Sequence, residues 1–447
     1  MRRKRHISKQ KNERGVVITL VAVFMLGIVA AMAALSIDVV TIYTARSEAQ
    51  LAADGAALAG ARVLANSGMT SAADSTVGVN AIPLAITVAT QVAASNKVGG
   101  RNLIPGASTC VTGQEICVSI NQAVTFIPNP QVTVTVQRTD LPTFFARIWG
   151  SAAVTVRASA TAEAYNPSNL SGTSTSTALP VAPTCVKPWL LPNLDPTSTT
   201  GGRIFDPVTG AIIANSNLLG WETPSGFGNP RLVSVCTTTC NSPVPTASAW
   251  QYYPGTTDAT LGSFPAPSAS SVACTNCTTP YELSIAGCVQ PPISCNSQVN
   301  VDDSSYSSRD AETGTAVDGL THATGNQGDK VDVNAPVGGP FEFMAGADNP
   351  VAQSGALPAG TDIMISDSLV TVPVIDTATN WPGSYPLNVQ IIGFVQLFLN
   401  PSGRVSFPAG SIRTKVINLV GCGTFIAGQP ILGNGASPVP VRLISPP

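Results

Sequence analysis

The pattern of hydrophobic and polar positions is dominated by one stretch near the start of the chain. Residues 16–37 form an uncharged apolar block of 22 residues, which Asp38 ends. As a helix, such a block is about 33 Å long, which matches the hydrocarbon core of a bilayer, about 30 Å thick. No other uncharged stretch of this length is as apolar. The pattern therefore predicts a single transmembrane helix.

The charges on either side of this block predict its orientation. Residues 1–14 carry seven Lys and Arg residues against one acid, whereas the charges that follow the block are mixed in sign. Because positive charge stays on the cytoplasmic side, the N-terminus is expected in the cytoplasm and everything beyond Asp38 outside it.

Two kinds of processing are alternatives to an uncleaved anchor. The segment 31–33 is an A-x-A-like site at which a signal peptide could be cut. Prepilin-type processing after Gly15 is the other. The apolar run continues past the first site, and Leu20 would stand where a prepilin places its glutamate. An uncleaved anchor is therefore favoured.

The helix is predicted to continue beyond the apolar block. Residues 39–66 contain no proline, and Gly55 and Gly60 are their only glycines. Ala52, Ala56 and Gly60 form a row of small residues at a spacing of four, which would let another helix approach closely. Alternatively, alanine is simply the best helix former. One transmembrane and stalk helix, assigned to residues 15–66, is expected; from residue 16 on it would be about 75 Å long.

Residues 67–165 predict a small α+β stalk domain. A helix is expected over residues 83–97, with proline in its first turn and two glycines after its end. Alternating, β-branched sequences then predict strands, and an apolar segment predicts a short helix. The strands are expected at 116–127, 131–138 and 152–164, and the short helix at 141–149.

The remainder predicts a linker and a large exterior region. Residues 166–184 are rich in Ser, Thr, Pro and Gly and are typical of a linker. Residues 185–447 predict a β-rich exterior, in which residues 389–399 suit a central strand buried on both faces. Three tryptophans are candidates for core or ring-stacking positions: Trp189, Trp221 and Trp250. Strands are expected at 362–374, 387–399 and 411–419.

The predicted fold class is thus a membrane-anchored α+β protein. A transmembrane helix extends into a long stalk helix, followed by a pilin-like α+β domain and a β-rich, disulfide-containing exterior. Charged residues make up only 11% of the chain, against roughly 25% in ordinary soluble domains. Beyond the basic tail of residues 1–14 the net charge is −8. An acidic exterior without a basic stripe argues against nucleic-acid binding.

The cysteines predict disulfides in the exported part of the chain. There are ten, an even number, and all lie beyond the apolar block, which favours disulfides in an oxidising compartment. Pairs that close short loops are the most economical: Cys110 with Cys117, and Cys288 with Cys295. The disulfide candidates are Cys110, Cys117, Cys185, Cys236, Cys240, Cys274, Cys277, Cys288, Cys295 and Cys422.

Metal binding and catalysis find little support. Cys236, Cys240, Cys274 and Cys277 have spacings that a zinc site could use, but the compartment favours disulfides. His322 is the only histidine outside the tail, and no G-x-S-x-G stretch accompanies it. A solvated loop histidine is expected, with no enzyme activity and no cofactor.

An acidic segment follows at residues 302–332 and is the remaining candidate for binding a cation. Its carboxylates could bind Ca²⁺, but their spacing does not match an EF-hand loop. A solvated acidic loop is therefore favoured. The acids are Asp302, Asp303, Asp310, Glu312, Asp318, Asp329 and Asp332.

Two stretches resemble the TadG-like proteins of Flp (tight-adherence) pilus assembly. The first comprises Arg14-Gly15, the apolar helix, Ile37-Asp38, a basic residue at 46 and the sequence LAADGAALAGA at 51–61. The second is VTVTVQRTDLPTFFARIWG at 132–150, followed by an alternating strand that ends ASATAEA. Together they cover about the first 165 residues. The sequence CVKPWLLPN at 185–193 and the late apolar strand show a looser likeness.

This resemblance implies a structural role. It predicts an inner-membrane component of a bacterial pilus and export machine that contacts lipid and other pilus-assembly or pilin-like membrane proteins, without enzymatic activity. Its bulk would be periplasmic or extracellular. Some members carry a von Willebrand A-type domain with a metal-binding D-x-S-x-S string. Asp303, Ser305 and Ser307 fit that string, but no buried strand precedes them. The alternative function is a membrane-anchored surface adhesin or binding ectodomain.

Overall fold

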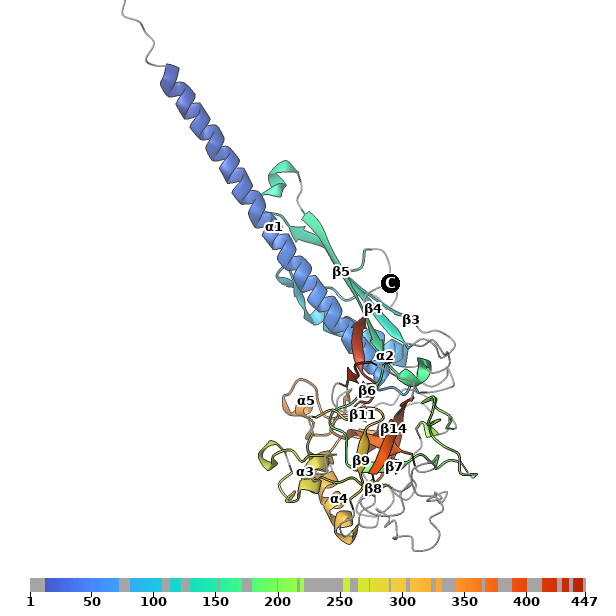
Figure 1. Ribbon diagram of the computed structural model, residues 1–447. Coiled ribbons are helices and arrows are strands. Elements are labelled where there is room, and N and C mark those ends of the chain that lie inside the picture. Colours follow the sequence, from blue (N-terminus) through green and yellow to red (C-terminus); the bar gives the residue numbers. More distant parts are fainter. Residues whose placement is uncertain are drawn as a thin grey trace, which may run out of the picture. The chain divides into compact units, whose positions relative to one another are not determined.

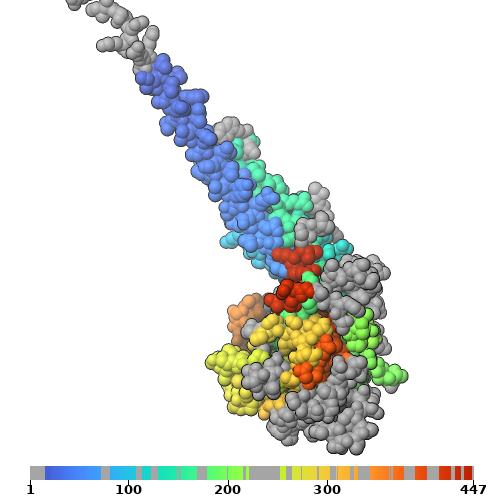
Figure 2. All heavy atoms as spheres, viewed as in Figure 1, coloured from blue at the N-terminus to red at the C-terminus, as the bar shows by residue number. Residues whose placement is uncertain are grey.

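The structure is a computed structural model of the 447-residue chain (Figures 1 and 2). It describes residues 13–71, 81–106, 113–121, 129–150, 153–170, 179–198, 200–214, 218–220, 252–257, 264–272, 274–288, 291–302, 306–322, 327–331, 343–363, 366–376, 388–399, 412–423, 428–433 and 437–444. The chain divides into two compact units. Unit 1 comprises residues 1–56, 90–118 and 134–160, and unit 2 comprises residues 57–89, 119–133 and 161–447.

Helix α1 (Glu13–Ala65) confirms the long N-terminal helix that the sequence predicts. Within it, residues 16–65 are long and apolar enough to cross a membrane, and none of the most apolar 18-residue window is buried. Figure 2 shows this end of α1 in blue with its side chains uncovered on the face in view. Bare apolar side chains over such a length are what a bilayer would cover.

Beyond the apolar block, α1 has one buried face made of alanine. The buried positions recur at the three-to-four-residue spacing of one helix face, and their small side chains allow close packing. In unit 1 they are Ala45, Ala49, Ala52, Ala53 and Ala56.

Four strands form a sheet in the order β17-β5-β4-β3. Their bounds are β3 (Ile116–Asn121), β4 (Gln131–Pro142), β5 (Ala153–Ala164) and β17 (Val441–Ile444). In β4 every second residue from Val132 to Arg138 is buried, as expected for a strand with one covered face. Helix α2 (Ala81–Ser95) confirms the second predicted helix, and β1 (Lys97–Val98) and β2 (Arg101–Asn102) form a short hairpin after it.

The short helix predicted at 141–149 is smaller than expected. Residues 141–142 still belong to β4, and only η1 (Ala146–Trp149), a 3-10 helix, follows. Its start coincides with backbone contacts to Asp38, described below, which local sequence does not reveal. The predicted strand 116–127 is described only to Asn121, and its remainder lies outside the described residues.

Unit 2 is built on a sheet of order β15-β14-β13-β7-β8, with β9 added to β14. The strands are β7 (Trp189–Pro192), β8 (Tyr253–Pro254), β9 (Gln298–Asn300), β13 (Leu369–Ile375), β14 (Asn388–Leu399) and β15 (Thr414–Gly421). Strand β14 lies between β13 and β15 and is almost wholly buried, which confirms the predicted central strand. Trp189 is a core residue against Tyr252, with ring centroids 6.0 Å apart; Trp221 and Trp250 lie outside the described residues.

Apart from α4, the remaining described elements of unit 2 are short. They are η2 (Pro167–Leu170), β6 (Val181–Ala182), η4 (Ala269–Ser271), α3 (Pro280–Ala286), α4 (Tyr306–Thr321), β10 (Lys330–Val331), β11 (Phe343–Met344), α5 (Pro350–Gln353), β12 (Asp362–Ile363) and β16 (Ile431–Leu432). The single strand predicted at 362–374 is therefore two, β12 and β13. The backbone turns between them, where the amide of Leu369 donates to the carbonyl of Ser366 (3.1 Å).

Helix α4 corrects the prediction of a solvated acidic loop. Its residue Arg309 pairs with Asp302 at 2.6 Å and with Glu312 one helical turn on. The helix was missed because glycines interrupt its sequence. One of them, Gly319, is set by packing, since a Cβ there would lie 2.5 Å from Sγ of Cys274.

Late segments of unit 2 are bonded to early ones. The side-chain amide of Asn418 in β15 donates to the carbonyl of Ala65 at the end of α1, at 2.6 Å. The hydroxyl of Ser71 donates to the carbonyl of Leu419 (3.0 Å), and the amide of Leu419 donates back (2.8 Å). Val441 in β17 pairs with Ala164 in β5.

Unit 2 contains both long-range and local disulfides. The bonds between described residues are Cys185–Cys288, Cys274–Cys277 and Cys295–Cys422. The predicted pair of Cys288 with Cys295 is wrong: sequence proximity suggested it, but folding places each beside a partner more than 100 residues away. Cys117 is also disulfide-bonded, while Cys110, Cys236 and Cys240 lie outside the described residues.

We predict that the stability of unit 2 depends on pH, because this unit contains a buried lysine. The ammonium group of Lys187 is shut away from water, and burial lowers its pKa to about 7; its Nζ donates to the carbonyl of Gly287 at 2.6 Å. Between pH 7 and the ordinary pKa of about 10.4, the unfolded chain then binds more protons than the folded one. The free energy of unfolding should therefore rise with pH across this window.

Urea unfolding at a series of pH values measures this slope. The variant Lys187→Met, which cannot titrate at this position, should show a smaller rise than the wild type. Identical slopes in the two proteins would contradict the assignment.

Candidate functional site: helix α1 and its polar contacts

Asp38, at the end of the apolar block, holds a distant loop of unit 1 by its backbone. Its carboxylate is buried and accepts three hydrogen bonds from backbone N–H groups: Phe144 (2.9 Å), Phe145 (3.0 Å) and Ala146 (2.7 Å). These donors precede or begin η1, where backbone N–H groups lack partners within the helix. The carboxylate that ends the apolar block thus also fixes the turn between β4 and β5.

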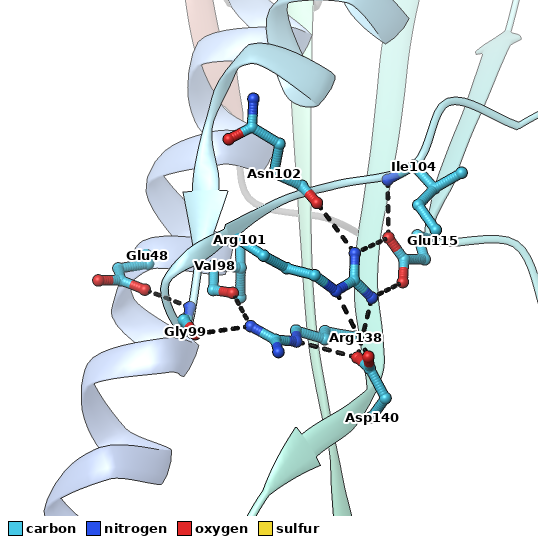
Figure 3. Close-up of polar contacts among 9 residues, drawn as sticks. All are labelled: Glu48, Val98, Gly99, Arg101, Asn102, Ile104, Glu115, Arg138 and Asp140. Atoms are coloured by element: carbon cyan, nitrogen blue, oxygen red, sulfur yellow. Dashed lines mark hydrogen bonds and ion pairs between the residues drawn. The ribbon is translucent and has the colours of Figure 1, made fainter.

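Ten residues further along α1, a second polar cluster ties the β1–β2 hairpin to its surroundings (Figure 3). Arg101 binds Glu115 through both of its terminal nitrogens, one at 3.0 Å. The same guanidinium reaches Asp140 on β4 at 2.9 Å. Such forked arginine–carboxylate pairs fix orientation as well as distance. The backbone N–H of Ile104 also donates to Glu115, at 2.7 Å.

Arg138 and Glu48 complete this cluster. The buried Arg138 pairs with Asp140 at 2.9 Å and donates to the carbonyls of Val98 and Gly99, the latter at 2.8 Å. The N–H of Gly99 donates to Glu48 on α1 at 2.6 Å. Gly99 has a φ of 58°, and a Cβ there would lie 2.4 Å from the side chain of Leu141. Only glycine therefore fits this turn.

The electrostatics of the cluster indicate a structural brace. Hydrogen bonds from Arg101 lower the pKa of Glu115, and hydrogen bonds from Arg101 and Arg138 lower the pKa of Asp140. Both carboxylates are therefore held ionised by arginine, the opposite of the raised pKa that a general acid needs. The cluster fastens a hairpin to α1 and β4.

Sequence reasoning missed this cluster, although a signal for it exists. Arg138 continues the inward-facing register of Val132, Val134 and Val136 along β4. An arginine at an inward position needs a buried partner, so the alternation alone could have marked the site.

Beyond the apolar block, the face of α1 opposite its buried alanine face carries uncovered apolar side chains. Val40, Tyr43 and Leu51 are exposed, Tyr43 to 72%. Their spacing of three and eight residues places them along one side of the helix. We call these three residues the apolar stripe.

The small-residue row of the sequence prediction lies on covered parts of α1. Ala52 and Ala56 are buried in unit 1. In unit 2, a Cβ added at Gly60 would lie 3.0 Å from Val132 on β4 and 3.2 Å from Ala89 on α2. A helix does approach Gly60 closely, and it is α2 of the same chain. Contact of the row with a second protein stays a prediction.

The candidates for metal binding and catalysis are placed as follows. Cys274 and Cys277 are bonded to each other. Within the described ranges, no group of three or more His, Cys, Asp or Glu side chains could hold a metal ion. His322, expected in a solvated loop, directly follows α4; its ring nitrogens lie 3.8 Å from Asp348 and 3.9 Å from Asp367.

The acidic residues of the predicted Ca²⁺ segment are only partly described. Asp329 accepts hydrogen bonds from the backbone of Gly346 (2.7 Å) and from Asn349 (3.0 Å). Together with the Arg309 pairs, these contacts show carboxylates engaged by the chain's own groups. Asp303, Ser305 and Asp332 lie outside the described residues.

Comparison with known proteins bears on the N-terminal part of the chain. No curated protein and no solved structure matches the sequence. A family match covers residues 15–63 alone. The second stretch of the resemblance, at 132–150, lies outside these residues and stays a prediction. The matched family is structural rather than enzymatic. Residues 15–63, which contain the apolar block, Asp38, Glu48 and the apolar stripe, match the family described as "Putative Flp pilus-assembly TadE/G-like".

Proposed function

We propose that this protein is a structural component of Flp (tight-adherence) pilus assembly or of a related envelope-spanning machine. Residues 16–37 of α1 anchor it in the bacterial inner membrane as a single pass. The N-terminal tail lies in the cytoplasm, and residues beyond Asp38 lie in the periplasm or outside the cell. The protein acts through contacts with other pilus-assembly proteins and performs no chemistry.

One observation carries this proposal: α1 is a single helix that changes character along its length, within the family match. Its first part is apolar and uncovered, as a membrane helix requires. Its later part has a buried alanine face on one side and the apolar stripe on the other. A helix that served only as an anchor would need neither face.

The arrangement of the rest of the chain follows from this anchor. We retain a cytoplasmic tail at residues 1–14, a membrane and stalk helix at 15–66, a stalk domain at 67–165, a linker at 166–184 and an exterior region at 185–447. Exposure of the exterior region to an oxidising compartment is consistent with its disulfides.

The apolar stripe is the surface that we propose for a partner helix. Apolar side chains at helical spacing dock into a groove or onto a second helix. A variant with both Tyr43→Ser and Leu51→Ser should therefore show a severalfold lower pilus output. The amount of partner protein recovered by cross-linking should fall to a similar extent. Because both side chains are exposed, the stability of the protein itself should change by no more than about 0.5 kcal/mol.

A matched control uses Ile104, an exposed apolar side chain of unit 1 that is not on α1. Ile104→Ser should leave pilus output unchanged. Normal assembly by the stripe variant, at normal protein level, would count against the proposal, as would an equal loss in the control.

A further inference from the structure

We propose that the loop of residues 143–149 rests on the outer surface of the membrane that α1 spans, with Asp38 holding it at that level. This inference rests on the proposed anchor. It assigns a second, interfacial contact with lipid, made by a part of the chain more than 100 residues after the transmembrane helix.

The position of the loop follows from its bonds to Asp38. This residue comes directly after Ile37, the last residue of the apolar block. An apolar block of about 33 Å fills a hydrocarbon core of about 30 Å, so Asp38 lies at the outer boundary of that core. Three hydrogen bonds of 2.7–3.0 Å then fix the backbone of residues 144–146 to the same level.

The side chains of the loop suit that level. Residues 144 and 145 of the loop are both phenylalanine. Phe144 is 63% exposed, and Arg147, three residues further on, is also exposed. Aromatic side chains concentrate at the boundary between lipid headgroups and acyl chains, and a basic side chain there is attracted to anionic lipid phosphates. A loop that exposes both a phenylalanine and an arginine therefore suits a lipid surface, which can cover the ring and attract the charge.

The charge of Asp38 gives a second reason to place the loop at the membrane surface. A carboxylate at the edge of a membrane is costly without partners. Three backbone donors supply those partners, and the loop that provides them is carried to the membrane surface. A single acidic residue thus marks the end of the membrane-spanning part of α1 and holds the loop at that level.

Fluorescence quenching in vesicles tests this inference on the full-length protein. A fluorescent amino acid is placed at position 24, 144 or 104, one at a time. The vesicles contain phosphatidylethanolamine and phosphatidylglycerol, with bromine near the headgroup or deep in the acyl chains. Phe24 lies within the apolar block, and Ile104 is as exposed as Phe144 at 61%. The β1–β2 hairpin that precedes Ile104 is tied to Glu48, about 15 Å beyond Asp38 along α1.

The expected result distinguishes the three positions. The probe at 24 should be quenched by deep bromine, and the probe at 144 severalfold more than the probe at 104, most strongly by bromine near the headgroup. Equal quenching at 144 and 104, with quenching at 24, would overturn the loop contact and leave the anchor intact. No quenching at 24 would overturn the anchor and the loop contact together.

A variant tests the role of Asp38 itself. In Asp38→Ala, quenching at 144 should fall to the level seen at 104 while quenching at 24 persists. Asp38→Asn keeps one oxygen acceptor and should retain part of the quenching at 144. This second variant keeps the test valid if the alanine variant fails to fold. Cross-linking of residue 144 to a protein in native membranes, without quenching by lipid, would also overturn the inference.

Discussion

Replacing both Cys295 and Cys422 with alanine is expected to lower the free energy of unfolding of unit 2 by about 4–5 kcal/mol. The bond spans 127 residues, and a cross-link over so long a loop restricts the unfolded chain strongly. Cys422 follows β15 directly, and Cys295 precedes β9, so the bond also fastens two strands that pair with β14. Urea unfolding followed by fluorescence measures the loss.

The pair Cys274 and Cys277 provides the matched control. Its bond spans three residues, and the same loop-closure argument gives about 2 kcal/mol. Double alanine variants of the two pairs should therefore differ by about 3 kcal/mol. Equal losses would show that local packing, rather than restriction of the unfolded chain, accounts for the contribution of these bonds.

Gly60→Leu is expected to destabilise unit 2 by about 2–3 kcal/mol, because overpacking a filled contact forces neighbours apart. A Cβ added at this position would lie 3.0 Å from Val132, 3.2 Å from Ala89 and 3.3 Å from the carbonyl of Ala85. That carbonyl belongs to the backbone of α2, so it cannot yield as a flexible side chain would. Thermal unfolding and urea unfolding both report the change.

Gly55→Leu on the same helix separates packing from helix propensity. There, a Cβ would meet only Val92, at 4.0 Å. Both substitutions gain up to about 0.8 kcal/mol in helix propensity over glycine, so the difference between them measures the packing at Gly60. Similar stabilities for the two variants would mean that α1 and α2 do not meet as closely as described.

The periodic features of this fold could be predicted from the sequence. The apolar block, the absence of proline up to residue 66 and the alternation along β4 each fixed an element through a local pattern. Strand β14 was predicted for the same reason, since a short, continuous apolar run suits a strand buried on both faces. These are signals that repeat within a few residues.

What the sequence could not reveal depends on contacts between distant residues. The sequence marks Asp38 only as the end of the apolar block, while its partners lie 106–108 residues away. The disulfide partners of Cys185 and Cys295 lie 103 and 127 residues away. Helix α4 was not predicted because two glycines interrupt its sequence, and one of them, Gly319, serves packing against Cys274 rather than local conformation. The Arg101 cluster combines residues from α1, the β1–β2 hairpin, β4 and the segment that precedes β3, which no single periodicity joins.

The bond between Asn418 and Ala65 has a consequence for how the chain is made. The two residues are 353 positions apart, and β17 pairs with β5 only once residues 441–444 are present. A ribosome delivers the N-terminal helix first, so the end of α1 and the edge of β5 must wait until nearly the whole chain has been synthesised. Pairings of such separation form slowly, and an open strand edge invites pairing with other chains in the meantime. Newly made copies therefore pass through an incompletely folded state, and the rates of translation and translocation set how long it lasts.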